Sequence, residues 1–198
     1  MVTFENTFTY THDKKRVISK AVDNRIGCGL AMQLASLFHD IELPYDIAFG
    51  ATVQEEVGLR GVQTITNLLK PTIYIAIDSS PINDLLEPDS LGKMGEGAML
   101  RIYDPGVIMP NDLRVYLETV AKTNNLKTQH YLSKGNTDAT RALIANEGVI
   151  ATSIVLPTRY IHSSAAMFEI ADLESVKDMI GAVLNDLTID KINKLLDK

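Results

Sequence analysis

The sequence alternates between short β-branched segments and longer amphipathic segments, and this alternation constrains the fold more than any other feature. Thr72–Ile77 and Val149–Leu156 have the composition of buried strands, whereas Gly27–His39 carries its apolar residues at helical spacing. Strands that alternate with helices pack as layers, with a sheet held between helices. We therefore expect a layered α/β fold.

The other elements follow in chain order. Further strands are predicted at 7–10, 16–19, 45–53, 98–103 and 126–131, and further helices at 58–69, 111–124, 138–146, 173–187 and 190–196. A threonine hydroxyl can accept a hydrogen bond from an exposed helix N–H, so Thr137 is expected to cap the helix that starts at Asp138.

Composition and charge exclude several classes of protein. A net charge of -6 argues against the basic patch of a nucleic-acid-binding protein. No apolar run is long enough to span a bilayer, and the first residues lack the order of a signal peptide. The single cysteine, Cys28, cannot form an internal disulfide, which fits a reducing compartment. We therefore expect a cytoplasmic protein with no nucleic-acid or membrane partner.

Acidic residues and one histidine follow the predicted strands. The candidates are Asp23 before the first long helix, Glu55 and Glu56 after 45–53, Asp78 at the end of 72–77, and His162 after 149–156. In open α/β sheets, ligands bind beyond the carboxyl ends of the strands, so these side chains should meet. Carboxylate and imidazole together favour zinc, cobalt or manganese. One carboxylate can bridge two ions, and a neighbouring free carboxylate can take a proton from the water between them.

Each candidate also has a simpler interpretation. A Glu-Glu pair is usually a solvated turn, and Asp78 could be a turn residue at a strand end. A lone histidine such as His162 is more often hydrogen-bonded inside a core. Asp23 could belong to a helix cap and nothing more. Only their placement at successive strand ends favours the metal interpretation.

Five short motifs resemble the dinuclear-metal aminopeptidases that assemble into tetrahedral dodecamers, the glutamyl-aminopeptidase or TET family. They are Asp23–Gly27, Gln54–Gly61, Ile77-Asp78, Gly135–Ala139 and Arg159–Ser163, in the family's order, with Asn136 where a second glycine is usual. The resemblance covers nearly the whole chain. It implies a three-layer zinc-peptidase-like fold, with a mixed central sheet flanked by helices, and a homo-oligomer that is a dodecamer in the intact family.

The resemblance also implies a role for each matched residue. Asp23 corresponds to the carboxylate that bridges two divalent metal ions, and Glu55 to the general base. Glu56 and His162 are the implied ligands of one ion and Asp78 of the other. The implied ions are zinc or cobalt, with manganese as a third candidate. The implied activity is hydrolysis of N-terminal residues from short peptides by a hydroxide that bridges the metals.

Residues expected to contact the substrate are Arg159, Tyr160, Thr137 and Asp138. The first two could instead position the neighbouring histidine.

Members of this family are longer at the front. Their N-terminal part supplies a histidine that completes the coordination of the metal held by Asp78, and a small β-barrel domain is inserted before the Asp23 segment. We expect residues 1–198 to form a single incomplete metallopeptidase catalytic domain without these two parts, with residues 1–20 the remnant that leads out of the inserted domain. The metal at Asp78 should then bind weakly, and the chain alone should be inactive or nearly so.

Two other functions stay open on the sequence. The same fold could serve as a non-catalytic metal-binding or assembly module. Glycoside hydrolysis of the cellulase type, a label that relatives have sometimes carried, would pair Glu55 with a second carboxylate. Adjacent carboxylates near a His-Ser segment fit metal binding better, and a metal chelator would separate these chemistries.

Overall fold

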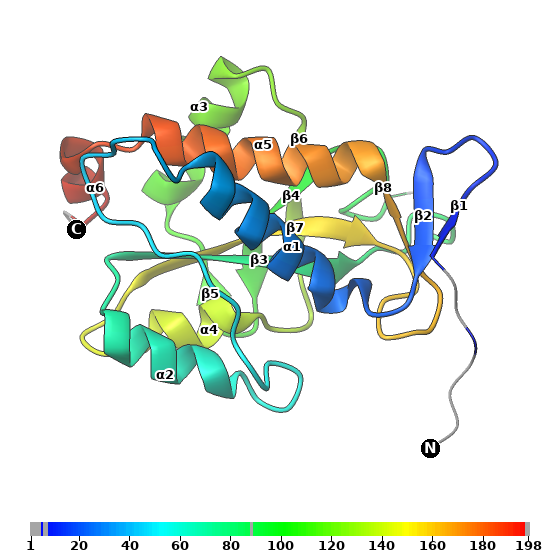
Figure 1. The fold of residues 1–198 in the computed structure, drawn as a ribbon, viewed down its shortest axis with the longest axis horizontal. Coiled ribbons are helices and arrows are strands. Elements are labelled where there is room, and N and C mark those ends of the chain that lie inside the picture. Colours follow the sequence, from blue (N-terminus) through cyan, green and yellow to red (C-terminus); the bar gives the residue numbers. More distant parts are fainter. Residues whose placement is uncertain (1–4, 6–7, 88, 197–198) are drawn as a thin grey trace.

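A computed structural model describes residues 5, 8–87 and 89–196 (Figure 1). Its centre is a mixed sheet made of β3 (Ile73–Pro81), β7 (Ile150–Thr158), β4 (Ala98–Asp104), β5 (Val107–Ile108) and β6 (Thr128–Leu132). β3 and β7 run parallel, from Ile73 beside Ile150 to Pro81 beside Thr158. β4 then pairs antiparallel with β7 and β5 and parallel with β6. The expected mixed central sheet is confirmed.

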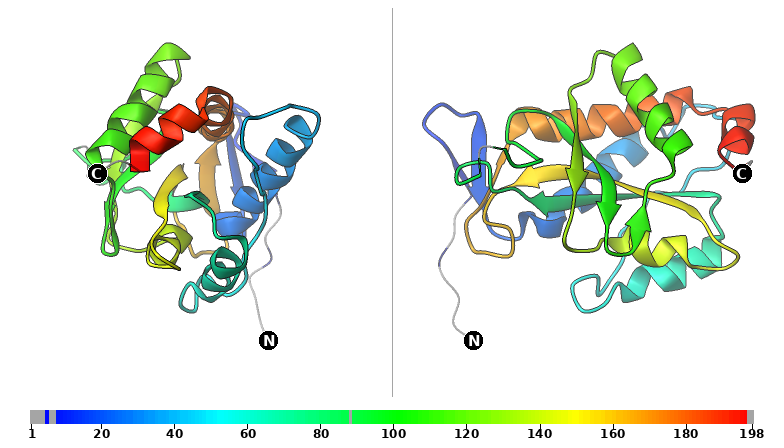
Figure 2. Two further views of the ribbon diagram at one scale, coloured as in Figure 1. Left: turned by 90° about the vertical axis from the view of Figure 1, so that its left-hand side faces the viewer. Right: turned by 180° about the vertical axis from the view of Figure 1, so that it is seen from behind.

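Six helices cover the two faces of this sheet in the described part of the chain. They are α1 (Val22–Leu37), α2 (Arg60–Leu69), α3 (Asn111–Thr123), α4 (Asp138–Leu143), α5 (Ile170–Asp186) and α6 (Ile189–Leu196). α1, α3 and α5 lie on one side and α2 with α4 on the other, which gives three layers (Figures 1 and 2). None of the described helices is long and apolar enough to cross a membrane.

The two faces are packed by cores of different size. The larger core includes Leu34 of α1, Leu117 of α3 and Met179 of α5, all almost fully buried against Ile154 of β7. The smaller core under α2 and α4 consists of Val62, Ala76, Ala139, Ala142 and Ala151. Because alanine has a short side chain, the smaller core lets α4 approach the sheet closely. Asp138, at the start of α4, lines the same groove as Tyr74 and Asp78 of β3.

A second sheet holds the beginning of the chain. β1 (Thr9–Tyr10), β2 (Arg16–Ser19) and β8 (Ala166–Glu169) are antiparallel, and Arg16 pairs with Glu169 at 3.0 Å. The strand predicted over 16–19 is confirmed, and the one predicted over 7–10 is shortened to Thr9–Tyr10, with residue 7 outside the described residues. β8 was not predicted. Because β2 leads into α1 and β8 follows the loop after β7, this sheet places Asp23 beside His162.

The prediction of a strand over Tyr45–Val53 is wrong. Tyr45, Ile47 and Phe49 point toward the larger core and alternate with exposed residues, as in a strand. However, a strand also needs a hydrogen-bonded neighbour, and the sheet ends at β3 in the described residues. The alternation of buried and exposed residues therefore correctly indicated an extended segment. It could not indicate that this segment has no neighbouring strand to pair with.

Two local expectations are also corrected. β3 does not close at Asp78 but continues to Pro81, because β7 stays beside it as far as Thr158. Thr137 occupies the N-cap position of α4 without capping it. Its hydroxyl lies 2.7 Å from the hydroxyl of Ser153, since both groups are buried and each needs a partner there.

Candidate metal centre

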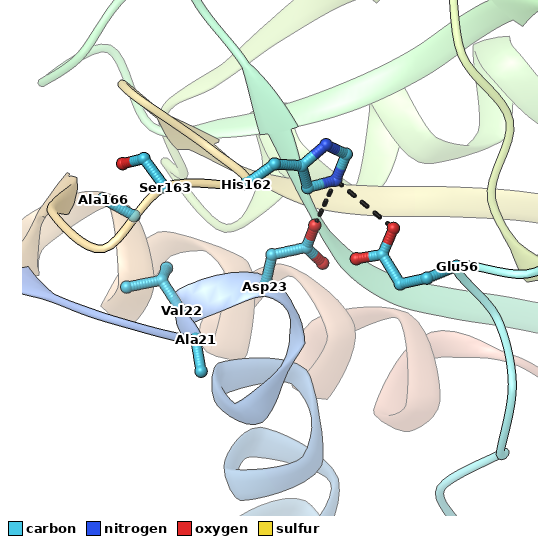
Figure 3. A pocket seen from close by; sticks show the side chains of 7 residues that line it. All are labelled: Ala21, Val22, Asp23, Glu56, His162, Ser163 and Ala166. Carbon is cyan, nitrogen blue, oxygen red and sulfur yellow. Dashed lines mark ion pairs between the residues drawn. The ribbon is translucent and has the colours of Figure 1, made fainter. Parts of the chain in front are cut away.

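Three of the predicted ligands converge in one cavity, and we call them the open cluster: Asp23, Glu56 and His162 (Figure 3). They come from the start of α1, the loop before α2 and the loop between β7 and β8. The Nε2 atom of His162 lies 2.8 Å from Oδ2 of Asp23 and 3.4 Å from Oε2 of Glu56. One ligand atom from each residue lies within 4.8 Å of the others. Two carboxylates and an imidazole at this spacing can share one divalent cation.

The open cluster faces solvent. The side chains of His162 and Glu56 are 64% and 58% exposed, while that of Asp23 is 14% exposed. Partial burial, followed by the charge of Asp23, raises the pKa of Glu56. His162 lies within ion-pair distance of both acids.

A second group of acids lies in an adjoining groove of about 340 Å³. Glu55, Asp78 and Asp138 line it, and we call this the acid groove. Asp23 and Glu56 line both cavities. Asp23 therefore has access to both regions, which is the placement that a bridging carboxylate needs.

The acids of the groove disfavour one another's ionisation. Burial and the charge of Asp23 raise the pKa of Asp78 to about 8. Burial, then the charges of Asp138 and Glu56, raises the pKa of Glu55 to about 7. Burial raises the pKa of Asp138 as well. Carboxyl groups held together with such pKa values indicate a site that lacks positive charge.

The start of α1 is tied directly to β3. The side-chain amide of Asn24 donates to the carbonyl of Ile77 at 2.7 Å and accepts from the N–H of Gly27 at 2.8 Å. A Cβ atom at Gly27 would lie 2.4 Å from that carbonyl, so only glycine permits this approach. The contact holds Asp23 next to Asp78, the residue after Ile77.

The loop that carries Glu55 and Glu56 is also fixed. The N–H groups of Gly58 and Leu59 donate to the carbonyl of Glu55, at 3.0 and 2.8 Å. Thr52 donates its hydroxyl to Asp138, which anchors the approach to the loop on α4. From this loop, Glu55 lines the groove, and Glu56 lines both the groove and the cavity of the open cluster.

Four of the nine described non-glycine residues with a left-handed backbone lie at or near the candidate ligands. Ala21, Gln54, Tyr160 and His162 adopt φ values of 55, 60, 56 and 60 degrees, and none of them is glycine. The left-handed region costs an L-residue about 1–2 kcal/mol, so such conformations persist only where the surroundings impose them. Each of these residues is a candidate ligand or lies within two positions of one, and such clusters are typical of functional sites.

The residues predicted to contact substrate have different surroundings. Arg159 forms a two-pronged ion pair with Asp84, at 2.8 and 2.7 Å, and lines neither cavity. Tyr160 is exposed, and Thr137 is buried against Ser153. Only Asp138 lines the groove, as the N-terminal residue of α4. The geometry of Arg159 favours the alternative role of positioning the His162 loop.

Sequence reasoning missed several residues that line the two cavities. Ser163 lies beside His162 in the open cavity, and Thr52 and Tyr74 line the groove. Ser163 could have been found from its place in the motif after His162. Thr52 and Tyr74 carry no local signal, because their position depends on contacts with α4 and α1.

Known proteins resemble this chain in both sequence and fold. Residues 1–179 match the M42 glutamyl aminopeptidase family. The glutamyl aminopeptidase of Lactococcus lactis is 41% identical over 181 residues, which are 91% of this chain and 51% of that protein. The chain spans about half the length of the relatives that it matches.

Solved structures of TET peptidases have a similar fold. The TET aminopeptidase of a marine sediment thaumarchaeon superposes with a TM-score of 0.91 at 30% identity, covering 96% of this chain and 54% of that one. The TET peptidase of Pyrococcus horikoshii superposes with a TM-score of 0.83 at 29% identity, covering 93% and 54%. The chain therefore belongs to the M42 glutamyl aminopeptidase family.

Proposed function

We propose that this chain carries the metal-binding region of an aminopeptidase that removes N-terminal residues from short peptides. One observation supports the proposal above all others: Asp23, Glu56 and His162 offer ligand atoms within 4.8 Å of one another. Their donor set of carboxylates and imidazole fits zinc or cobalt, with manganese as a third candidate.

Two divalent ions would be held on either side of Asp23. Glu56 and His162 would hold one of them in the open cluster, and Asp78 would hold the other in the acid groove. Asp23 is the least exposed of the three ligands and lines both cavities, which supports a bridging role for it. When bound, such ions polarise the scissile carbonyl and lower the pKa of the attacking water.

Glu55 is the proposed general base. Its carboxyl group is partly buried beside the other acids, which raises its pKa to about 7. A carboxylate with a pKa near the working pH can accept a proton from water and return it to the leaving amine. Glu55 lies outside the group of three converging ligands, which leaves it available as the base.

The oligomeric state and the cellular location of the whole protein are further parts of the proposal. The TET peptidase of P. horikoshii assembles into a tetrahedron or an octahedral shell. We extend a homo-oligomeric state to the protein that carries this chain, and we place it in the cytoplasm.

Glycoside hydrolysis is the competing activity. A structure described as an endoglucanase from Thermotoga maritima superposes with a TM-score of 0.71 at 26% identity. Glu55 beside Asp78 or Asp138 could act as an acid–base pair without a metal. The convergence of His162 on two carboxylates has no use in that chemistry and favours the peptidase.

The test uses aminoacyl p-nitroanilides and carboxymethyl cellulose as rival substrates. The chain is assayed alone and after co-expression with the half of the L. lactis relative that lies outside the match. We expect the chain alone to be inactive or nearly so, and the combination to release p-nitroaniline until a chelator is added. Glu55→Gln should lower turnover by about 10²-fold or more while keeping the metal, and Glu56→Gln should lose the metal. Cellulose hydrolysis that survives the chelator would overturn the proposal.

A further inference from the structure

His162 gains little support from contacts of its own side chain. In the described part of the chain, its imidazole forms ion pairs only with Asp23 and Glu56, the other two members of the open cluster (Figure 3). The side chain is mostly exposed, and the backbone of His162 is left-handed. The position of the imidazole therefore depends on the backbone of residues 159–167, which we call the ligand loop.

The ligand loop is a compact turn that closes at its base. Arg159 and Met167 exchange both backbone hydrogen bonds, each at 2.9 Å. Within the loop, the hydroxyl of Ser163 donates to the carbonyl of Tyr160 at 2.5 Å and accepts from the N–H of Ala165 at 3.1 Å. Because the loop is held together internally, its direction is set by the way its base is anchored to the rest of the chain.

Asp84 anchors one side of that base. It lies in the loop that follows β3, and its carboxylate accepts from Nε and a terminal nitrogen of Arg159, at 2.8 and 2.7 Å. The side chains of Arg159 and Asp84 are only 14% and 10% exposed. A two-pronged ion pair that is shielded from water fixes geometry better than a pair on the surface.

Asp84 is itself fixed by a second contact. Its Oδ2 atom accepts from the N–H of Met94 at 3.2 Å, ten positions further along the chain. The side chain of Met94 is buried in a small core, and Met167 packs against the same core. The segment after β3 therefore contacts both ends of the base of the ligand loop, Arg159 through the ion pair and Met167 through the core.

We propose that Asp84 is a positioning residue for the metal ligand His162 and that it acts through Arg159. The inference rests on the proposed function in one respect, which is the role of His162 as a ligand. A left-handed backbone at His162 is strained, so it persists only where the surroundings impose it, and the anchored base of the ligand loop does so. Residues behind the ligands of a metal contribute to its affinity by orienting those ligands.

Zinc affinity and local amide exchange test the proposal together. Asp84→Ala should weaken zinc binding by about tenfold, as measured by titration calorimetry on the chain with zinc alone. In the metal-free chain, the same substitution should speed deuterium exchange at residues 160–166 more than in α3 and α5. Arg159→Lys keeps the charge but loses the two-pronged geometry, so it should weaken zinc binding by a smaller factor.

A double variant shows whether Asp84 acts through Arg159. In the Arg159→Met background, Asp84→Ala should weaken zinc binding no further, because the pair is already broken. Val183→Ala, in the larger core near the C-terminal end of α5, is the control for stability. It should lower the free energy of unfolding and leave both zinc affinity and exchange at residues 160–166 unchanged.

Three outcomes would overturn the proposal. One is an Asp84→Ala chain that binds zinc as tightly as the parent chain. Another is an equal loss of zinc affinity in Val183→Ala, which would assign the effect to general stability. The third is a pair of independent, additive losses for Asp84→Ala and Arg159→Met. A parent chain that binds no zinc would count against the proposed function instead, and exchange at residues 160–166 would still decide whether Asp84 holds the ligand loop.

Discussion

The open cluster and the acid groove share Asp23 but differ in the groups that lie beside their acids. In the open cluster, His162 lies between two carboxylates and solvent reaches the group. In the groove, Glu55, Asp78 and Asp138 lie together, Arg25 is the only basic residue among the described lining residues, and the pKa of each acid is raised. The comparison indicates that the open cluster pairs its acids with an imidazole, whereas the acids of the groove ionise only partly near neutral pH.

The largest expected effect separates the two regions by metal affinity. His162→Ala should weaken zinc binding by about 100-fold or more, since it removes one of three converging ligands. Asp78→Asn should weaken the first zinc ion by less than about tenfold, because that residue lies outside the open cluster. Titration calorimetry measures both. His130→Ala, a half-exposed histidine paired with Glu118, is the control and should change nothing. Equal losses for His162→Ala and Asp78→Asn would mean that the regions are one site.

The second prediction concerns pH and the acid groove. The pKa of Asp78 is about 8 in the folded chain, which is above its pKa in the unfolded chain. Once the pH exceeds the pKa of the unfolded chain, ionisation of Asp78 therefore favours unfolding. Stability in a chelator should therefore fall between pH 5 and pH 8, by on the order of 2 kcal/mol. Zinc should restore stability at pH 8 by binding the folded state.

Urea denaturation at the two pH values checks this dependence. Asp78→Asn should remove most of it, because the amide does not ionise. Asp46→Asn provides the control, since Asp46 is exposed and lines neither cavity. A chain that is more stable at pH 8 than at pH 5 without metal would contradict the assignment of buried, mutually repelling acids.

The third prediction tests the anchor between the two regions. Thr52→Val removes the hydroxyl that donates to Asp138 and leaves a buried carboxyl oxygen without that partner. We expect a loss of about 1–2 kcal/mol in the free energy of unfolding. Thr52→Ser keeps the hydroxyl and should lose clearly less. If both variants were as stable as the parent chain, the hydrogen bond would not hold the Glu55 loop on α4.

The smallest effect is expected from relief of backbone strain in the His162 loop. Tyr160 has a φ of 56 degrees and an exposed side chain, so Tyr160→Gly should relieve about 1 kcal/mol of strain. Part of this gain is offset by the greater freedom of glycine in the unfolded chain, which leaves about 0.5 kcal/mol of stabilisation. Thermal unfolding measures it. Tyr103→Gly, in the extended β4, should destabilise instead, and a similar loss at Tyr160 would show that its ring makes a necessary contact.

Much of the fold was accessible from local pattern. The helix over residues 27–39 and the strands over 72–77 and 149–156 were predicted from apolar spacing, and all three are present with shifted ends. The motifs around Asp23, Glu55 and His162 indicated the family, and the comparisons confirm that part. Local pattern succeeds here because helix periodicity and β-branched runs depend on neighbours within a few residues.

The sequence by itself determined which side chains are available and which segments are helical or extended. Tertiary structure alone decided that residues 45–53 have no strand partner, that Arg159 pairs with Asp84 and that Asp78 lies apart from the open cluster. It also decided that β2 pairs with β8, which brings the His162 loop to Asp23. The physical reason is distance along the chain, since Arg16 and Glu169 are 153 positions apart and no short-range preference can record which distant segments will pair.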